Sequence, residues 1–273
     1  MICLGIESTA HTFSVGIVKD KEVLSVARDM FVPAQGGINP IDAKNHHEKV
    51  KDAVLEKALQ EAKLSLENID IFAYSMGPGL PPSLKVGAQF VKQIAGSKPI
   101  IEVNHGVAHI EIGRLMTGAH DPIIVYVSGG NTQIIGYAAG RYRVFGETQD
   151  IPIGNAIDVF VRETYGKGRK ADSFGGPILE REAEGGHYVE LPYVVKGMDL
   201  SFTGIMTAAI QKYNGTNFKD LAFSFQETCY AMLTEVTERA LAHTGKKEVM
   251  LVGGVAASKR FSEMVEKMCE ERG

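Results

Sequence analysis

The sequence predicts an α/β protein made of two similar halves with a cleft between them. Residues 1–104 combine short apolar strands with amphipathic helices, and residues 105–273 repeat this theme. Each half opens with strands joined by turns rich in glycine, serine and threonine. Hydrophobic residues make up 44% of the chain, enough to fill a sizeable core. We therefore expect two lobes, 1–104 and 105–273.

The first half is expected to form three strands, then helix, strand, helix and strand. Short apolar runs predict the strands, and apolar residues spaced three and four apart predict the helices. Asn104 is a good N-cap for a further helix. The segment 33–45 is rich in proline, glycine and asparagine and is expected to be a loop. The predicted strands are 2–6, 13–18, 22–28, 70–75 and 99–103, and the predicted helices are 46–63 and 84–95.

The second half is expected to open with another set of three strands. A long helix and a further strand follow, and a last helix begins near Lys259. A glycine-rich and basic stretch covers roughly 165–187. The predicted strands are 123–127, 132–137, 142–145 and 249–252, and the predicted long helix is 218–243.

The overall charge is weakly acidic. There are 33 Asp and Glu against 29 Lys and Arg, a formal net charge of −4. Because a free-standing nucleic-acid-binding protein is usually basic, contact with RNA is expected to use a local patch or a partner.

The cysteines and the apolar runs indicate the compartment. Cys3, Cys229 and Cys269 form no Cys-x-x-Cys pair, which favours a reducing environment. No apolar run approaches the roughly 20 residues of a membrane span, and the first residues lack the pattern of a signal peptide. A cytoplasmic location is therefore expected.

A pair of histidines, His105 and His109, follows Asn104. On a helix, residues four apart lie on one face, so two imidazoles in this position can bind one metal ion. A plain pair of histidines is about equally consistent with the spacing. A zinc peptidase helix needs Glu directly after the first His, and this position is Gly106, so that mechanism is not supported.

Three turns rich in glycine, serine or threonine follow strands at 7–12, 126–132 and 253–258. Residues without Cβ let backbone N–H groups approach a phosphate, and hydroxyls add donors. Each turn alone is more often a plain turn, but three of them in both halves favour a nucleotide in the cleft. The sequence has neither a Walker A motif nor Gly-x-Gly-x-x-Gly after a strand, which disfavours P-loop and dinucleotide binding.

Two further segments carry charged candidates. Asp158 lies in a helix that opens near Ile153 and either binds a ligand hydroxyl or amine or is solvated. Lys167, Arg169 and Lys170 lie among glycines, in either a solvated loop or a patch that steers phosphate.

Seven segments stand in order along nearly the whole chain: GIESTAHTFSVGIV, GPGLPPSLKVGA, VNHGVAHIEIGR, YVSGGNTQIIGY, RYRVFGETQDIPIGNAIDVF, LPYVVKGMDLSFTGI and LVGGVAAS. Together they resemble the universal tRNA threonylcarbamoyladenosine transferase family. The segments are most similar to the archaeal and eukaryotic branch, the catalytic subunit of the KEOPS complex, formerly labelled O-sialoglycoprotein endopeptidase.

The resemblance implies the actin-like ATPase superfold of sugar kinases, heat-shock ATPases and actin. It implies transfer of threonylcarbamoyl from threonylcarbamoyl-AMP to the exocyclic amine of the adenosine adjacent to the anticodon, in tRNAs reading codons that begin with adenine. The implied partners are tRNA, a small protein kinase and small dimerising subunits. The implied cofactor is one divalent ion, iron or zinc or else magnesium, besides the adenine nucleotide.

The resemblance also assigns site residues. His105, His109 and Tyr126 correspond to metal ligands. We add Glu7 as the candidate for proton removal or for ordering a water; it is otherwise a turn carboxylate. The residues at substrate-binding positions are Tyr126, Val127, Ser128, Gly129, Gly130, Asp158, Gly176, Glu180 and Ser258.

Two departures from the family pattern stand out. The last glycine motif usually ends in Asn, and here the residue is Ser258, whose shorter side chain is expected to weaken that contact. An Asp-Asn-Gly segment that completes the metal site in the family would follow Gly273. We therefore expect a truncated chain or part of a longer product, with weaker metal retention. A metallopeptidase and a non-catalytic ATP-binding scaffold are the rival interpretations.

Overall fold

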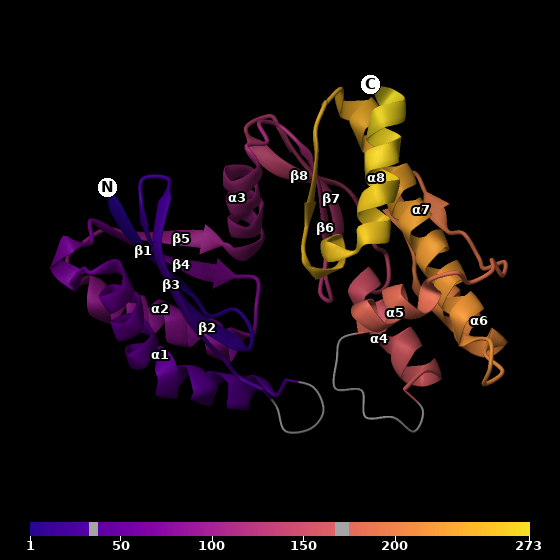
Figure 1. Cartoon of the computed structure of the whole chain (residues 1–273). Coiled ribbons are helices and arrows are strands. Elements are labelled where there is room, and N and C mark those ends of the chain that lie inside the picture. Colours follow the sequence, from indigo (N-terminus) through magenta and orange to yellow (C-terminus); the bar gives the residue numbers. More distant parts are fainter. Residues whose placement is uncertain (33–37, 167–174) are drawn as a thin grey trace. The chain divides into compact units, whose positions relative to one another are not determined.

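The computed structural model describes residues 1–32, 38–166 and 175–273. The chain divides into two compact units, Met1–Ile112 and Gly113–Gly273 (Figure 1). The division falls within helix α3 (His105–Thr117), so both predicted metal-binding histidines belong to the first unit. In the described part of the chain, no helix combines the length and the apolar character needed to cross a membrane.

The first unit contains a five-stranded sheet in the order β3-β2-β1-β4-β5. β1, β2 and β3 are antiparallel neighbours, and β4 and β5 continue parallel to β1. All five strands predicted in this half are confirmed. The strands are β1 (Ile2–Glu7), β2 (Thr12–Lys19), β3 (Glu22–Met30), β4 (Ile71–Gly77) and β5 (Ile100–Asn104).

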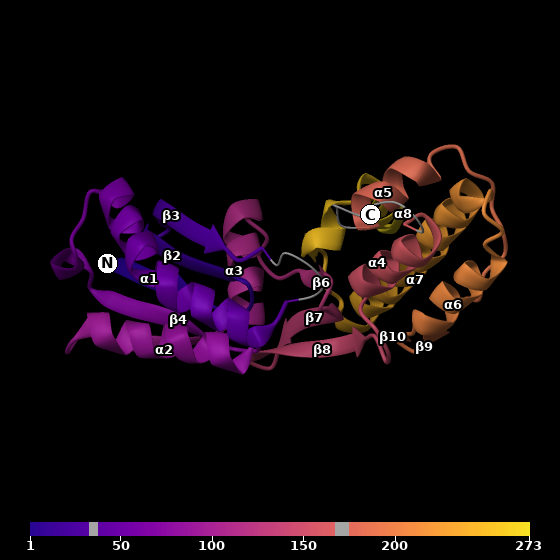
Figure 2. The ribbon, with the colours of Figure 1, turned by 90° about the horizontal axis from the view of Figure 1, so that it is seen from below.

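Two helices, α1 (Pro40–Ala62) and α2 (Pro81–Ala95), pack side by side on one face of this sheet (Figures 1 and 2). The alternation along β2 explains the arrangement, because Phe13, Val15 and Ile17 are all buried while their neighbours are not. A short 3-10 helix, η1 (Leu66–Asn68), precedes β4.

Both helices begin earlier than predicted. Residues 40–45 were expected in a loop, yet α1 begins at Pro40, where the Asn39 side chain accepts a hydrogen bond from the Ile41 N–H at 2.8 Å. Proline is well placed in a first helical turn because its missing N–H would have no partner there. Helix α2 also begins with proline, at Pro81, three residues before its predicted start at residue 84. The predicted cap of α3 is confirmed, since Asn104 accepts from the Val107 N–H at 3.1 Å.

The second unit contains a four-stranded sheet in the order β11-β6-β7-β8, with β11 parallel to β6 and the others antiparallel. The long helix α7 packs on this sheet. The predicted strands and the long helix are confirmed. The elements are β6 (Ile123–Val127), β7 (Thr132–Ala138), β8 (Arg141–Glu147), β11 (Val249–Val252), η2 (Gly254–Ala257), α4 (Ile153–Thr164), α7 (Phe218–Thr244) and α8 (Lys259–Arg272).

The sequence analysis did not predict three features of the second unit: two helices and a short hairpin. Helix α5 (Gly175–Ala183) lies within the stretch expected to be only glycine-rich and basic, and α6 (Thr203–Lys212) follows a short hairpin of β9 (Val195–Lys196) and β10 (Asp199–Leu200). The core explains why they fold. Phe160 of α4 stacks on Phe218 and Phe225 of α7, and buried residues of α5 and α6 join the same cluster.

Asp150 ties the loop before α4 to the start of α6, and its charge is expected to stabilise the second unit. Its carboxylate accepts backbone hydrogen bonds from Ile151 at 2.7 Å and from Phe202 and Thr203 at 2.9 Å each. Burial raises the pKa of Asp150, but these hydrogen bonds outweigh it and leave the pKa below its usual value. The ionised form is therefore the one that the fold favours.

Replacing Asp150 by Asn is expected to lower the free energy of unfolding by about 1 kcal/mol at pH 7. The folded pKa is depressed, so this contribution is present above the unfolded pKa of about 3.9 and disappears as the pH falls through the folded pKa. Urea unfolding at pH 7 and at pH 3 measures both effects. Asp52→Asn, on an exposed position of α1, is the control. An Asp150→Asn difference that persists undiminished at pH 3 would contradict the expectation.

Candidate functional site

The turn between β6 and β7 is a tight loop organised by Ser128. The Ser128 hydroxyl accepts from the backbone N–H groups of Gly130 at 3.2 Å and Asn131 at 3.0 Å. The Ser128 N–H donates to the Asn131 carbonyl at 2.8 Å. The serine is therefore needed to hold the turn, besides any contact it makes with a ligand.

Two glycines hold this turn between neighbouring elements. At Gly154, the first turn of α4, a Cβ would lie 2.6 Å from the Ser128 carbonyl oxygen and 2.7 Å from the Gly129 nitrogen. At Gly253, before η2, a Cβ would lie 2.8 Å from the Val127 carbonyl carbon, and φ is +103°. Only glycine permits such close backbone approach. The motifs around residues 128, 154 and 253 are distant in sequence but adjacent in the fold.

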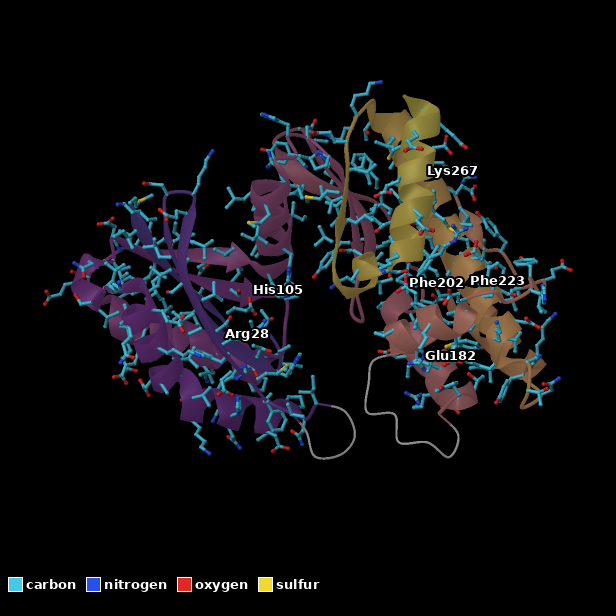
Figure 3. All side chains as sticks on the ribbon, in the orientation of Figure 1. Arg28, His105, Glu182, Phe202, Phe223 and Lys267 are labelled. Atoms are coloured by element: carbon cyan, nitrogen blue, oxygen red, sulfur yellow. The ribbon has the colours of Figure 1, made fainter. Side chains whose placement is uncertain are left out.

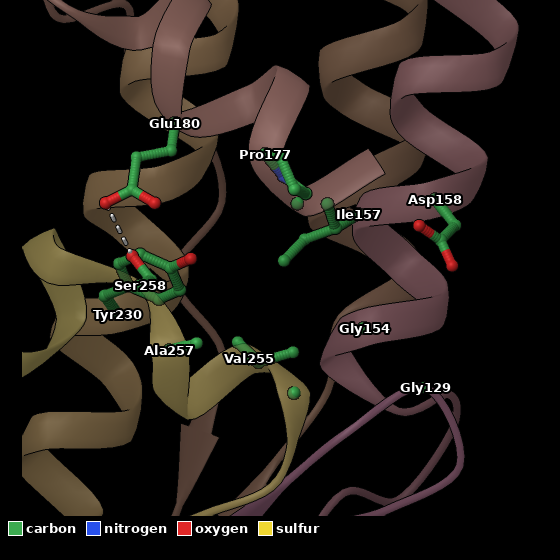
Figure 4. A pocket seen from close by; sticks show the side chains of 12 residues that line it. Gly129, Gly154, Ile157, Asp158, Pro177, Glu180, Tyr230, Val255, Ala257 and Ser258 are labelled. Atoms are coloured by element: carbon green, nitrogen blue, oxygen red, sulfur yellow. Dashed lines mark hydrogen bonds between the residues drawn. The ribbon is translucent and has the colours of Figure 1, made fainter. Parts of the chain in front are cut away.

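A cavity of about 430 Å³ opens beside the turn, wholly within the second unit (Figure 4). Its wall comes from α4, α5, α7, η2 and the turn itself. Ile157, Pro177 and Val255 supply apolar surface, and Asp158, Glu180 and Ser258 supply polar groups. A pocket that is mostly apolar with a few converging polar groups is typical of a small-ligand site.

Three of the lining glycines leave room for a ligand. At Gly129, Gly176 and Gly254, no atom of the described residues lies within 4 Å of where a Cβ would stand. A ligand can therefore contact the backbone of three separate elements. Gly129 and Gly254 belong to two of the three predicted glycine turns, and the binding of a nucleotide by these turns stays a prediction.

The carboxylates at the pocket also hold the elements that form it. Asp158 Oδ1 accepts from the Gly175 N–H at 2.7 Å, at the start of α5. Glu180 Oε1 accepts from the Lys259 N–H at 2.8 Å, at the start of α8. A carboxylate at a helix N-terminus satisfies backbone donors and meets the positive end of the helix dipole.

His105 lies at the start of α3 (Figure 3). Its Nε2 atom lies 3.2 Å from the Nε2 atom of His109. An ion bound at about 2.0–2.1 Å by two imidazoles in tetrahedral geometry holds their nitrogens about 3.3 Å apart, so the pair fits as two ligands of one ion. Burial, with a smaller effect of His105, lowers the pKa of His109 and favours the neutral imidazole that binds metals. The described ranges contain no group of three or more His, Cys, Asp and Glu arranged to hold an ion.

Glu7 lies beside the first histidine of this pair, His105. Its carboxylate lies 3.0 Å from His105 Nδ1 and accepts from the Thr9 N–H at 2.7 Å and from the Ser75 hydroxyl. Burial raises the pKa of Glu7, but these hydrogen bonds outweigh it and bring the pKa to about 2. A carboxylate on Nδ1 orients a histidine whose Nε2 binds a metal. The geometry is compatible with a positioning role for Glu7, and the expected role in proton removal or in ordering a water stays a prediction.

The structure brings together one part of the predicted substrate set. Gly129, Asp158, Gly176, Glu180 and Ser258 all line the pocket. Gly130 lies in the same turn, and Tyr126 and Val127 lie in β6. Tyr126 is only 5% exposed, and its role as a metal ligand stays a prediction. The basic candidates Lys167, Arg169 and Lys170 lie outside the described residues.

Sequence reasoning missed the apolar wall and Tyr230. Ile157 and Pro177 lie beside the predicted Asp158 and Gly176, and Val255 lies within the predicted turn 253–258, so the pocket could have been extended from the motifs. Tyr230 is in the middle of α7, among buried residues at helical spacing, and nothing in that pattern separates a core tyrosine from one that lines a pocket.

The fold is shared with solved structures of low sequence identity. HypF from T. kodakarensis aligns with 98% of this chain and 43% of its own, at 14% identity and a TM-score of 0.63. The ROK hexokinase from Thermus thermophilus aligns over 99% of this chain and 88% of its own, at 16% identity and a TM-score of 0.51. The chain therefore has the actin-like ATPase superfold, as the sequence predicted.

Relatives of higher identity define the family. The family model described as tRNA N6-adenosine threonylcarbamoyltransferase matches residues 22–273. A protein of that name from Thermococcus sibiricus is 54% identical over 277 residues, covering 100% of this chain and 84% of the relative. A probable bifunctional tRNA threonylcarbamoyladenosine biosynthesis protein from Thermoplasma acidophilum is 50% identical, covering 100% of this chain and 51% of the relative. The chain belongs to the tRNA N6-adenosine threonylcarbamoyltransferase family and is a transferase.

Proposed function

We propose that the chain transfers the threonylcarbamoyl group from threonylcarbamoyl-AMP to the exocyclic amine of the adenosine adjacent to the anticodon, in tRNAs reading codons that begin with adenine. The observation that carries the proposal is the pocket of the second unit, in which three open glycines face a volume suited to an adenylate. Family membership supplies the reaction, and the pocket supplies a place for the nucleotide.

In this proposal the adenosine part lies between apolar surfaces, and the phosphate meets the turn at Ser128–Gly130. Ile157 and Val255 contact the base, while the carboxylates of Asp158 and Glu180 accept hydrogen bonds from ligand hydroxyls or amines. Backbone N–H groups at the turn stabilise negative charge on the phosphate. The apolar wall and the phosphate turn stand on different elements, so the site depends on the packing of the whole unit.

The reaction is an acyl transfer with a good leaving group. The adenosine nitrogen attacks the carbamoyl carbon, the bond from this carbon to the phosphate oxygen breaks, AMP leaves with the electron pair, and the nitrogen loses one proton to water. An aromatic amine is a weak nucleophile, so holding both reactants in place carries much of the rate. The turn at Ser128–Gly130 stabilises the charge that develops on the departing phosphate.

His105 and His109 are the residues that would hold a divalent ion, iron or zinc or else magnesium, with Tyr126 as the proposed third ligand. Such an ion, when bound, supplies Lewis-acid chemistry toward a carbonyl oxygen. Glu7 fixes the ring of His105 through Nδ1 and presents its Nε2 beside that of His109.

The net charge of the chain and its family membership suggest the proposed partners. A subunit with a formal net charge of −4 gains little from general attraction to RNA, so much of the affinity for tRNA would come from companion proteins. We propose that these are the small protein kinase and the small dimerising subunits of a KEOPS-type complex. The bifunctional name of the Thermoplasma relative is consistent with a joined second activity.

Replacing Gly129 by Leu is expected to weaken AMP binding at least about 10-fold, because the added side chain would occupy the pocket beside the phosphate turn. The fold should tolerate the change, since the described residues place no atom within 4 Å of the Cβ position. Isothermal titration calorimetry with AMP measures the affinity. Gly204→Leu, an equally open glycine on α6, is the matched control. Equal affinity in Gly129→Leu and the wild type would refute the placement of the phosphate.

A further inference from the structure

Three neighbouring strands of the first sheet, β1, β4 and β5, bring polar side chains to one edge of the sheet. Ile6 of β1 lies opposite Tyr74 of β4, and the two strands are parallel. Glu7 and Ser75 are therefore the next residues along these two strands. β5 runs parallel to β4 on its other side, and His105 follows the last residue of β5. This edge holds the carboxyl ends of parallel strands, where open α/β sheets bind their ligands.

The hydroxyl of Ser75 is directed at the carboxylate of Glu7. Ser75 is only 6% exposed, and its hydroxyl donates to Glu7 Oε2. With a pKa of about 2, the Glu7 carboxylate is ionised and only accepts hydrogen bonds. The same oxygen lies 3.0 Å from His105 Nδ1, so the ring N–H is the donor in that contact. The other oxygen, Oε1, accepts from the Thr9 N–H at 2.7 Å.

The bond from Ser75 decides which neighbour receives the ring proton of His105. Nδ1 lies 3.0 Å from Glu7 Oε2 and 3.4 Å from the Thr9 hydroxyl oxygen. Without the Ser75 hydroxyl, the Thr9 N–H would still hold Oε1, but Oε2 would lose the donor that keeps it beside the ring. A proton held on Nδ1 leaves Nε2 with the lone pair that binds a metal ion. Ser75 thus lies two hydrogen bonds away from the ring whose orientation it supports.

We infer that Ser75 is a positioning residue of the proposed metal site, which fixes the ring of His105 through the Glu7 carboxylate and so keeps Nε2 available to the ion. The inference rests on the proposed function, because it takes His105 and His109 to hold a divalent ion. It goes further by placing the control of a metal ligand in β4, a strand that contributes neither histidine. In this proposal Ser75 does not touch the ion and acts only through Glu7.

The test is a double-mutant cycle of Zn²⁺ affinity, measured by competition with a chromophoric chelator. We expect Ser75→Ala to weaken Zn²⁺ binding about 10-fold, as loss of an outer partner of a metal ligand does. In a Glu7→Ala background the same change should weaken binding less than about 2-fold, because its route to His105 has been removed. Ser75→Thr keeps the hydroxyl and should restore the affinity to within about 2-fold of the wild type.

Ser25→Ala is the matched control. Ser25 is also 6% exposed and lies in β3 of the same sheet, but its hydroxyl donates to the Ala58 carbonyl at 2.8 Å. Its replacement should leave Zn²⁺ affinity unchanged. Nitrogen NMR of the metal-free protein gives a second readout that does not depend on metal. We expect His105 to carry its proton on Nδ1 in the wild type and in Ser25→Ala, and Ser75→Ala to show a mixture of the two ring tautomers.

The outcomes separate this inference from the metal site on which it rests. Wild-type Zn²⁺ affinity in folded Ser75→Ala, or equal weakening with and without Glu7, would overturn the inference and leave the metal site standing. If Ser75→Ala does not fold, the wild type still decides, because a His105 proton found on Nε2 would contradict the inference. A wild type that binds no Zn²⁺ would overturn the proposed metal site together with the inference.

Discussion

Replacing both His105 and His109 by alanine is expected to remove bound metal entirely and to lower threonylcarbamoyl transfer to tRNA at least about 100-fold. The two Nε2 atoms lie 3.2 Å apart, at the separation that two ligands of one ion require, and Glu7 orients the first ring through its Nδ1. Alanine removes both nitrogens, and no other described side chains form a group that could replace them. The fold should persist, because neither imidazole belongs to the buried core of the first unit.

Metal content after dialysis and transfer of labelled threonine to tRNA, with the partner subunits present, measure the two effects. His120→Ala, which removes an exposed imidazole outside the pair, is the control and should change neither. Thermal unfolding checks that the double variant is folded. A folded double variant that keeps a full equivalent of metal would show that the pair is not the metal site. One that loses metal but keeps its activity would separate the metal from the chemistry.

The order of strands and helices could be predicted because local periodicity decides it. Phe13, Val15 and Ile17 alternate with polar or small residues, and this pattern is compatible with a strand that has one covered face. Helix starts were harder, since proline and asparagine are read first as loop residues. At Pro40 the pair Asn39-Pro40 is a cap followed by a first helical residue, and the surrounding glycines concealed this signal.

The glycine motifs of the site could be predicted one by one, but their contacts could not. Gly154 and Gly253 lie 26 and 125 residues after Ser128, and only the folded unit shows that their missing Cβ atoms make room for the turn. Helix capping by Asp158 and Glu180 is similarly invisible before the fold is known, because each carboxylate caps a helix other than its own. Tyr230 was missed for a related reason. The helical spacing of buried residues in α7 does not distinguish a residue that lines a cavity from one that packs in the core.

Replacing Gly253 by alanine is expected to destabilise the second unit by at least about 3 kcal/mol and to abolish AMP binding. Two causes add. The φ of +103° is a conformation that L-residues rarely adopt, and the new Cβ would lie 2.8 Å from the carbonyl carbon of Val127, which is backbone and cannot rotate away. Relief requires a shift of the strand end that carries Ser128, and this shift would move the turn proposed to bind the phosphate.

Gly245→Ala is the reference for replacing a glycine of positive φ that has open space around its Cβ position. Gly245 ends α7 with a φ of +71°, and the described residues place no atom within 4 Å of its Cβ position. Its replacement should therefore cost about 1 kcal/mol, the conformational part alone, and leave AMP binding intact. Urea unfolding and calorimetry with AMP on both variants make the comparison. Suppose instead that Gly253→Ala lowers the free energy of unfolding no more than Gly245→Ala does. The close approach to Val127 would then not affect stability, and other contacts would fix the turn at Ser128.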